Sequence, residues 1–551
     1  MKIWNDVKYL WSHKCFRIGI PLMMILSYIT LIINPTVGID DTSFKLYYVD
    51  GVSPAMGRWC LYLMNKVVPL AYNPHFVEAV GLSFFCLSIT LWCVVFFRMF
   101  GKGLSVAVYA IFGMVMLSSP ILSEVVIWYL QDGIYLGYGF AALAVLFAME
   151  AFQGGAKKRM GRLLGASLML VTALGFYEAF MIVFLMAMVM NFMLIRVLDK
   201  SDYSRKVRDW FINILAICVC AMVFRAVIVN GIIAIDHLQE QAKVLESRGL
   251  GDILGLLSGW FDGTRSPGKF GFVLKDFFVK YYIHAIVYVP VMILVLAVLV
   301  LVLWSIICTV RKKDGWILAA ALGIILLPWV MPVLEGWATY YRSGEYVPLL
   351  TAFAILPVAW ELRNIKKRSV RVGACVLTGY LLYWQGYEMN HWLYVDARKY
   401  ENDRVVMNAI ALDVLENYGA DKPLCIIGRY KVPESLVSDV YVPEWSKKFN
   451  LVRWLVKAVD EDIFEKYYVE GKGYATAETP ALSMINWGTF AYGMPGDELI
   501  KFWKMHGFTF ECDMEHRQEA AELMQGGPAW PEKGAIVEME DYIIVNFGEE
   551  E

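Results

Sequence analysis

Long apolar segments recur along the first 390 residues, and short polar stretches separate them. A helix needs about 20 mostly apolar residues to cross the hydrocarbon core of a membrane. The segments that reach or approach this length are 18–33, 76–97, 104–119, 133–152, two within 163–198, 210–229, 282–308, 316–333, 346–360 and 372–387. The pattern therefore predicts a polytopic α-helical membrane protein with about eleven transmembrane helices.

The segment 163–198 is too long for one span, and we expect it to divide at Gly175-Phe176-Tyr177-Glu178. Glycine lowers helix propensity, and a charged residue is disfavoured in the middle of a span. Two helices joined by a tight turn are therefore predicted, with Glu178 in that turn at the membrane boundary.

Lysine and arginine residues cluster in alternate loops of this arrangement. The clusters lie within 2–17, 98–102, 157–162, 196–208, 311–313 and 363–371. Because basic loops stay in the cytoplasm, we expect a cytoplasmic N-terminus. The extracytoplasmic side then holds the remaining loops, the turn at Glu178 and everything after residue 388. In the first outer loop, the helical spacing of apolar residues in 57–68 predicts a short helix along the membrane surface.

From about residue 391 the composition becomes that of a soluble domain. Helices are expected at 397–417, 451–468 and 497–506, and strands at 423–429 and 508–512. Two apolar runs at 534–538 and 542–546 predict a β-hairpin. We therefore expect a transmembrane domain at 1–390 and an extracytoplasmic α/β domain at 391–551.

Composition narrows the possible functions. Hydrophobic residues make up 58% of the chain and charged residues 19%, which is typical of a protein with many spans. The net charge of -2 gives no support for nucleic acid as a partner. The sequence contains no phosphate-binding loop, dinucleotide fingerprint, HExxH or GxSxG motif. Any chemistry is therefore expected from polar side chains on the outer face.

Two adjacent carboxylates, Asp40 and Asp41, follow the first apolar segment and the helix-breaking Pro35 and Gly38. A carboxylate near an apolar boundary can have a raised pKa, which suits a general base acting on a sugar hydroxyl. The alternative is structural, since aspartate caps helices well. The predicted position on the outer face, beside other polar residues, favours the catalytic interpretation. A divalent metal, Mg²⁺ or Mn²⁺, could bridge the pair to a phosphate, and the sequence neither requires nor excludes one.

Other ionisable residues fall on the same predicted face. Arg58 suits a phosphate because a guanidinium donates parallel hydrogen bonds, although an interfacial arginine that reaches the headgroups is an equal alternative. Arg225 lies in the outer part of a span and needs an anionic partner: a lipid phosphate, Glu178 or Asp236. Glu124 follows the third apolar segment. Glu178, at membrane depth, is a functional candidate, with a helix-turn cap as the alternative.

The stretch 335–342 places Tyr341 and Arg342 beside further aromatic residues, just before an apolar segment. Aromatic rings with polar groups suit the face of a sugar, and an arginine suits a phosphate. The alternative is an aromatic belt at the membrane interface with an ordinary interfacial arginine.

The runs NPTVGIDD, SFKLYYVDG and GRW, and later LGFYEA, resemble the bacterial Gtr type II glucosyltransferases, which are serotype-converting enzymes of the O-antigen type. Members of this family are polytopic membrane glycosyltransferases of the GT-C class. The chain departs from the family at Glu178, where the family favours Gln. The resemblance implies a GT-C-like catalytic domain in the membrane part of the chain.

The same resemblance implies transfer of a hexose, glucose in the first place, from a polyprenyl phosphate such as undecaprenyl phosphate. The acceptor would be an extracytoplasmic polysaccharide or lipid-linked glycan at the bacterial cell membrane. Asp40 or Asp41 would be the base of a single displacement that inverts the anomeric carbon. The substrate-binding residues would be Arg58, Glu124, Tyr177, Glu178, Arg225, Tyr341 and Arg342.

Two alternatives stay open. A flippase or transporter of polyprenyl-linked lipid or polysaccharide usually has ionisable residues near the midplane or repeated, broken helices. The predicted spans carry almost no charge in their middle parts, and the two halves of the chain show no evident symmetry. Another lipid-dependent transferase would use a Ser or Thr nucleophile with metal ligands, or a buried histidine. The histidines on the outer side are scattered, which disfavours that alternative.

Overall fold

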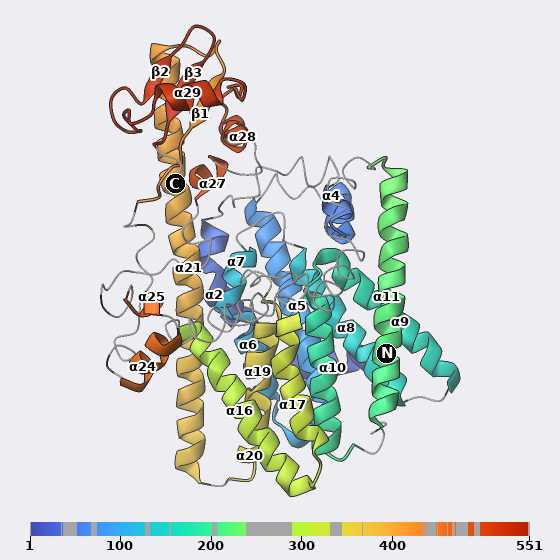
Figure 1. Cartoon of the computed structure of the whole chain (residues 1–551). Coiled ribbons are helices and arrows are strands. Elements are labelled where there is room, and N and C mark those ends of the chain that lie inside the picture. Colours follow the sequence, from blue (N-terminus) through green and yellow to red (C-terminus); the bar gives the residue numbers. More distant parts are fainter. Residues whose placement is uncertain are drawn as a thin grey trace.

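Helices make up most of the described chain (Figure 1). The computed structural model describes residues 2–34, 36, 52–67, 74–126, 133–153, 156–200, 206–238, 289–330, 344–365, 367–433, 436, 448, 450–459, 461–465, 469, 483–489 and 496–548. No water is available inside a bilayer, so a spanning segment must satisfy its backbone groups internally, and a helix does so.

Within the described part of the chain, seven helices are long and apolar enough to cross a membrane. They are α2 (Lys14–Ile33), α5 (Pro74–Phe100), α8 (Ile134–Gln153), α9 (Ala156–Phe176), α10 (Phe180–Val197), α11 (Val207–Ile235) and α16 (Val289–Lys312). Large apolar side chains such as Phe211 and Val227 of α11 are exposed, as expected for a surface that faces lipid. The chain is therefore a polytopic helical membrane protein.

The other four apolar segments form shorter or composite helices. They are α6 (Val106–Leu117) with η5 (Pro120–Leu122), α17 (Trp316–Leu326) with η9 (Leu327–Trp329), α19 (Tyr346–Phe353) with α20 (Ile355–Leu362), and the first part of α21 (Arg368–Asn417). Prolines stand at or near several of these interruptions, because proline lacks the N–H that continues a helix. The count of eleven spans stays a prediction.

The division predicted within 163–198 is present. Helix α9 ends at Phe176 and α10 begins at Phe180. The N–H of Tyr177 still donates to the carbonyl of Ala173 at 3.1 Å, and the N–H of Phe180 donates to the carbonyl of Tyr177 at 3.3 Å. The turn is therefore tight, and Glu178 lies inside it.

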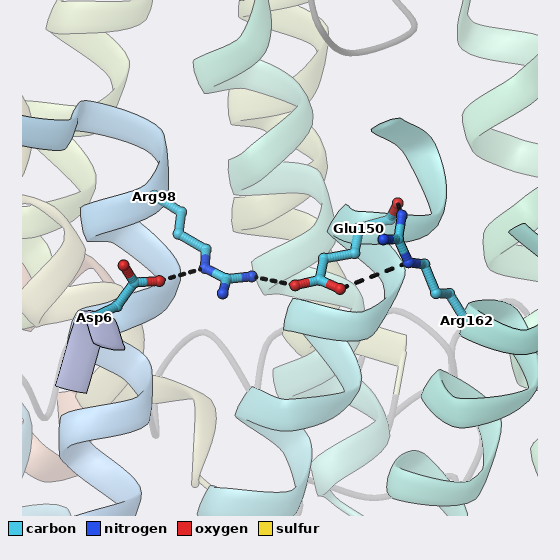
Figure 2. A network of polar contacts seen from close by, with 4 residues as sticks. All are labelled: Asp6, Arg98, Glu150 and Arg162. Atoms are coloured by element: carbon cyan, nitrogen blue, oxygen red, sulfur yellow. Dashed lines mark hydrogen bonds and ion pairs between the residues drawn. The ribbon is translucent and has the colours of Figure 1, made fainter. Parts of the chain in front are cut away.

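Four helices are joined at one end of the bundle by a network of ion pairs (Figure 2). Arg98 of α5 donates from Nε to Asp6 of α1 (Lys2–Trp11) at 2.9 Å and from Nη1 to Glu150 of α8 at 2.8 Å. Glu150 also lies 3.6 Å from the Nε of Arg162 in α9. Two basic and two acidic side chains thus balance one another, and they fix α1 to the bundle.

Two short helices, α3 (Val52–Ala55) and α4 (Trp59–Val67), lie at the opposite end of the bundle, which is the end that the basic residues predict to be the outer one. The second occupies the position predicted for a short helix in 57–68. It packs against the end of α9 and against α11, which places α4 beside the α9–α10 turn.

Helix α21 is a single helix of 50 residues that passes through residue 390 without a break. At 1.5 Å per residue it is about 75 Å long, more than twice the roughly 30 Å of a hydrocarbon core. Figure 1 shows it running along the bundle and on to the sheet beyond the outer end. Its Asn390 accepts a hydrogen bond from Thr30 Oγ1 of α2 at 2.9 Å, so the helix is attached to the bundle.

The C-terminal region contains a three-stranded sheet in the order β1-β3-β2. Strand β1 (Leu424–Ile427) is parallel to β3 (Ile543–Asn546), and β2 (Ile536–Glu538) pairs antiparallel with β3 as the predicted hairpin. The strand predicted at 508–512 is not formed, because Cys512 makes only an isolated bridge with Leu424. Asp513 then accepts hydrogen bonds from the next backbone N–H groups and turns the chain away from the sheet.

Short helices complete this region: α24 (Asn450–Val459), α25 (Glu461–Phe464), α27 (Met484–Gly488), α28 (Asp497–Met505) and α29 (Arg517–Leu523). The apolar face of α21 forms a core with the sheet and α28, where the Nε1 of Trp503 donates to the carbonyl of Met407 at 2.8 Å. Trp487 of α27 packs against both this core and the core of the membrane bundle. The two cores are thus in contact through one side chain.

Candidate functional site

Arg58, Tyr177 and Glu178 meet at the outer end of α9, at the other end of this helix from Arg162. Arg58 donates from Nε to Oε2 of Glu178 at 3.4 Å and from Nη2 to Oε1 at 3.3 Å. Its guanidinium carbon lies 4.6 Å from the centre of the Tyr177 ring, within range of a cation–π interaction. Arg58 is therefore held between a carboxylate and an aromatic face, in a fork geometry that also fits a phosphate.

A glycine allows α4 to approach this turn. A Cβ added to Gly175 would lie 2.6 Å from the Trp59 side chain, so a larger residue would force the two helices apart. Arg58 directly precedes α4, and Tyr177 directly follows α9. The close packing of these helices therefore brings the arginine to the turn.

Arg225, which lies within the membrane-spanning helix α11, extends its side chain to the same site. Its Nη2 donates to the carbonyl of Met56 at 3.2 Å. Gly57 has a φ of +87°, and a Cβ there would lie only 1.8 Å from that Nη2. Among the described residues, no hydrogen-bond acceptor lies in reach of the buried Nε of Arg225. Arg225 interacts electrostatically with both Glu178 and Arg58, so the three side chains form one charged cluster.

The cluster of Arg58, Arg225 and Glu178 carries two positive charges and one negative charge. Burial alone would raise the pKa of Glu178, but the guanidiniums of Arg58 and, further away, Arg225 lower it below its ordinary value. Glu178 therefore stays ionised at neutral pH and is poorly suited to act as a general base. The net charge of the cluster is consequently positive, which favours an anionic ligand.

A second contact fixes α4 to the end of α11. Asp236 accepts hydrogen bonds from Lys66 Nζ at 2.5 Å and from the hydroxyl of Tyr62 at 2.7 Å. These bonds, that of Lys66 first, lower the pKa of Asp236. Two carboxylates were considered as partners for Arg225. Asp236 instead forms an ion pair with Lys66. Glu178 is the carboxylate that interacts electrostatically with Arg225.

Residues 29–359 match the family model of glucosyl transferase GtrII. This range covers more than half of the chain and includes every residue of the site described above. The chain belongs to the GtrII glucosyltransferase family. The family supports a glycosyltransferase role for the chain. No curated protein and no solved structure matches the chain.

The structure does not describe the side chains of the other residues that the sequence predicts for the site. Asp40, Asp41, Tyr341 and Arg342 lie outside the described residues. Glu124 lies in the short helix α7 (Ser123–Val126), but its side chain is also outside the described part. The structure therefore brings together four of the predicted residues: Arg58, Tyr177, Glu178 and Arg225.

Two buried carboxylates of the GtrII bundle are missing from the sequence-based prediction. Glu78, one turn inside α5, has no exposed surface, and Glu345, at the start of α19, keeps 1% of its surface. Glu78 lies close enough to Tyr28 to interact electrostatically, and the backbone carbonyl of Glu345 accepts a hydrogen bond from Tyr138 at 2.8 Å. Glu78 lies near the end of its span, so it does not affect the expectation of almost no charge at mid-span. The position of Glu78 inside the predicted apolar segment 76–97 could have identified it as a candidate, because an ionisable residue within a span is often functional.

The two guanidiniums and their net positive charge are suited to an anionic group such as a phosphate. Among the described residues, no group of three or more His, Cys, Asp and Glu side chains could hold a metal ion. Asp40 and Asp41, the pair considered for a metal, lie outside those residues. The positive charge available to a phosphate at the described site therefore comes from Arg58 and Arg225.

Proposed function

We propose that this chain transfers a hexose, glucose in the first place, from a polyprenyl-phosphate donor to an extracytoplasmic polysaccharide or lipid-linked glycan. The observation that carries the proposal is the meeting of Arg58, Arg225 and Tyr177 at the outer end of the bundle. Two guanidiniums can bind a phosphate at the membrane boundary while the lipid chain stays in the bilayer. The GT-C class, which we propose for the chain, is consistent with a site at the membrane boundary.

The proposed reaction is a single displacement. The acceptor hydroxyl oxygen attacks the anomeric carbon and forms the new glycosidic bond, while the bond between that carbon and the phosphate oxygen breaks. The electron pair of the broken bond stays on the polyprenyl phosphate, and a carboxylate base takes the hydroxyl proton. Arg58 and Arg225 stabilise the negative charge that develops on the phosphate, which is the kind of electrostatic contribution that dominates many enzymes.

We assign the base to Asp40 or Asp41. The lowered pKa of Glu178 makes this residue a weak proton acceptor, and its carboxylate is already engaged by Arg58. The aspartates follow α2 in the same outer loop that continues into α3 and Arg58. That proximity in sequence supports a role for them next to the phosphate site.

We also propose a multi-pass protein of the bacterial cell membrane, with a cytoplasmic N-terminus and the C-terminal region outside. The support is the distribution of basic residues. Arg98 and Arg196 lie near the C-terminal ends of α5 and α10, and Arg162 lies near the N-terminal end of α9, so all three are at the end of the bundle opposite the α9–α10 turn. Basic residues stay on the cytoplasmic side. Accessibility tags at Lys157 and after Glu551 should report opposite sides, and a report from the same side would contradict this topology.

The test of the activity is sugar transfer by the purified full-length chain in lipid vesicles, with a polyprenyl-phosphate hexose and a panel of glycan acceptors. One of the variants Asp40→Asn and Asp41→Asn should lose about 10²–10⁴-fold in rate, the usual contribution of a general base. Arg58→Lys should raise the KM for the donor, because lysine cannot donate in parallel. Lys66→Gln, which removes an outer cation away from the cluster, is the matched control and should keep donor KM within about twofold.

Full turnover in both aspartate variants would contradict the assignment of the base. Movement of the lipid between leaflets without any transfer would contradict the enzyme and favour the flippase. Equal effects of Arg58→Lys and Lys66→Gln on donor KM would contradict the phosphate site.

A further inference from the structure

Glu178 is the only carboxylate among the described residues that forms an ion pair with Arg58, and it holds this arginine loosely. The two hydrogen bonds of 3.3 and 3.4 Å are longer than typical charge-assisted bonds. The Glu178 side chain keeps 41% of its surface exposed, whereas Arg58 keeps 15%. Glu178 is therefore the more exposed partner of the pair, and its charge lies beside the site.

The charge of the ligand changes during the proposed reaction, and the inference rests on that proposed function. The donor is a phosphodiester and carries one negative charge. When the bond between the sugar and the phosphate oxygen breaks, the electron pair remains on the phosphate and the hydroxyl proton goes to the base. The product is then a phosphate monoester with a charge of about -1.5 to -2 at neutral pH. A site with two full positive charges would bind this product more tightly than the donor.

We propose that Glu178 is a specificity-determining residue that offsets one unit of the positive charge that Arg58 and Arg225 present to the phosphate, so that the site retains the phosphodiester donor but releases the polyprenyl phosphate product. The two positive charges of Arg58 and Arg225 would neutralise a dianion. The negative charge of the ionised Glu178 offsets one of them. The arginines still stabilise the charge that develops as the bond breaks. The repulsion between Glu178 and the phosphate grows as negative charge develops, and it is greatest on the completed monoester.

The size of the effect follows from the added charge. A carboxylate acting on one further negative charge across roughly 6 Å, at an effective dielectric constant of about 40, changes binding about tenfold. Removal of the carboxylate charge should strengthen the binding of both anions, but that of the product by about tenfold more. The discriminating quantity is therefore the ratio of the inhibition constant of polyprenyl phosphate to the KM of the donor.

Four variants of the full chain in vesicles test this inference. Glu178→Gln removes the negative charge and keeps nearly the same side-chain shape. Glu178→Ala also removes the charge, and it introduces no new polar group that would need a hydrogen-bond partner. Glu178→Asp keeps the charge. Asp236→Asn removes an outer carboxylate that pairs with Lys66 instead of the arginine cluster, and it is the matched control.

We expect the ratio of product inhibition constant to donor KM to fall about tenfold in Glu178→Gln and Glu178→Ala. It should stay within about twofold of the unmodified chain in Glu178→Asp and Asp236→Asn. A ratio that is unchanged in both neutral variants, while transfer continues, would overturn the role of Glu178 and leave the proposed activity standing. Equal falls in Glu178→Gln and Asp236→Asn would overturn it as well, because the effect would then be a general property of the outer face. Absence of transfer by the unmodified chain would instead refute the proposed function.

Discussion

Replacement of Arg98 by methionine tests whether the network of Figure 2 anchors the N-terminal helix. The substitution keeps a long apolar side chain but leaves Asp6 and Glu150 without the guanidinium that joins them. Removal of one partner from a buried ion pair costs about 3–5 kcal/mol. Arg98, Asp6 and Glu150 keep 13%, 25% and 22% of their side-chain surface, so water partly compensates for the loss. We expect the free energy of unfolding to fall by about 2–3 kcal/mol, just below that range.

The assay is equilibrium unfolding in mixed micelles, with Arg208→Met as the matched control. Arg208 is 79% exposed, and its described ion pair, with the neighbouring Asp209, is long at 3.8 Å. An exposed pair of this kind contributes about 0–1 kcal/mol, so the control should lose little stability. Combination of Arg98→Met with Glu150→Gln should recover about 1 kcal/mol or more as coupling energy. Equal losses in the two arginine variants, or a coupling energy near zero, would refute the anchoring role.

Three further changes are predicted. Gly57→Ala should reduce transfer at least about tenfold, because the site has a φ of +87° and the added Cβ would displace Arg225; normal activity would show that this guanidinium is dispensable. Burial raises the pKa of Asp403 to about 7 in the folded chain, well above that of an unfolded aspartate. The folded state therefore keeps this proton at a pH where the unfolded state has lost it. The contribution of Asp403 to the free energy of unfolding should be complete below about pH 4 and should fall by about 2–4 kcal/mol as the pH rises to about 7. Asp403→Asn should flatten that profile in pH-dependent unfolding, and an unchanged slope would assign the dependence to another group. Trp487→Ala should cost about 2 kcal/mol and speed protease cleavage of the C-terminal region, whereas an unchanged cleavage rate would contradict its bridging role.

The sequence pattern was sufficient for much of the helical architecture. The turn around Tyr177 was predictable because Gly175 and Glu178 interrupt a segment that is otherwise apolar and too long for one span. The β-hairpin near the C-terminus was predictable because polar residues separate two short apolar runs. In contrast, the passage of α21 through residue 390 was not foreseen, because the composition changes there although no proline or glycine stops the helix.

The site was predictable in residue type but not in pairing. Arg58 and Arg225 were both recognised as phosphate candidates from their chemistry, but 167 positions separate them and no local pattern shows that α3 and α11 meet. The sequence could not show whether Glu178 or Asp236 is the partner of Arg225. The answer depends on which carboxylate forms an ion pair with Lys66, and tertiary packing decides that. Glu78 was missed because one glutamate near the end of a span hardly changes its average hydropathy.

The continuity of α21 links two properties of the C-terminal region. The same helix is attached to α2 at Asn390 and carries the apolar face around Met407 that supports the sheet. Each residue inserted between these points would raise the sheet by about 1.5 Å and rotate it by about 100°. Four inserted residues would thus turn it by about 40°, whereas seven would lift it by about 10 Å and restore its direction to within about 20°. A change in the length of this segment therefore alters the height of the region and keeps the direction it faces only when the change is close to a whole number of helical turns, such as about seven or eleven residues.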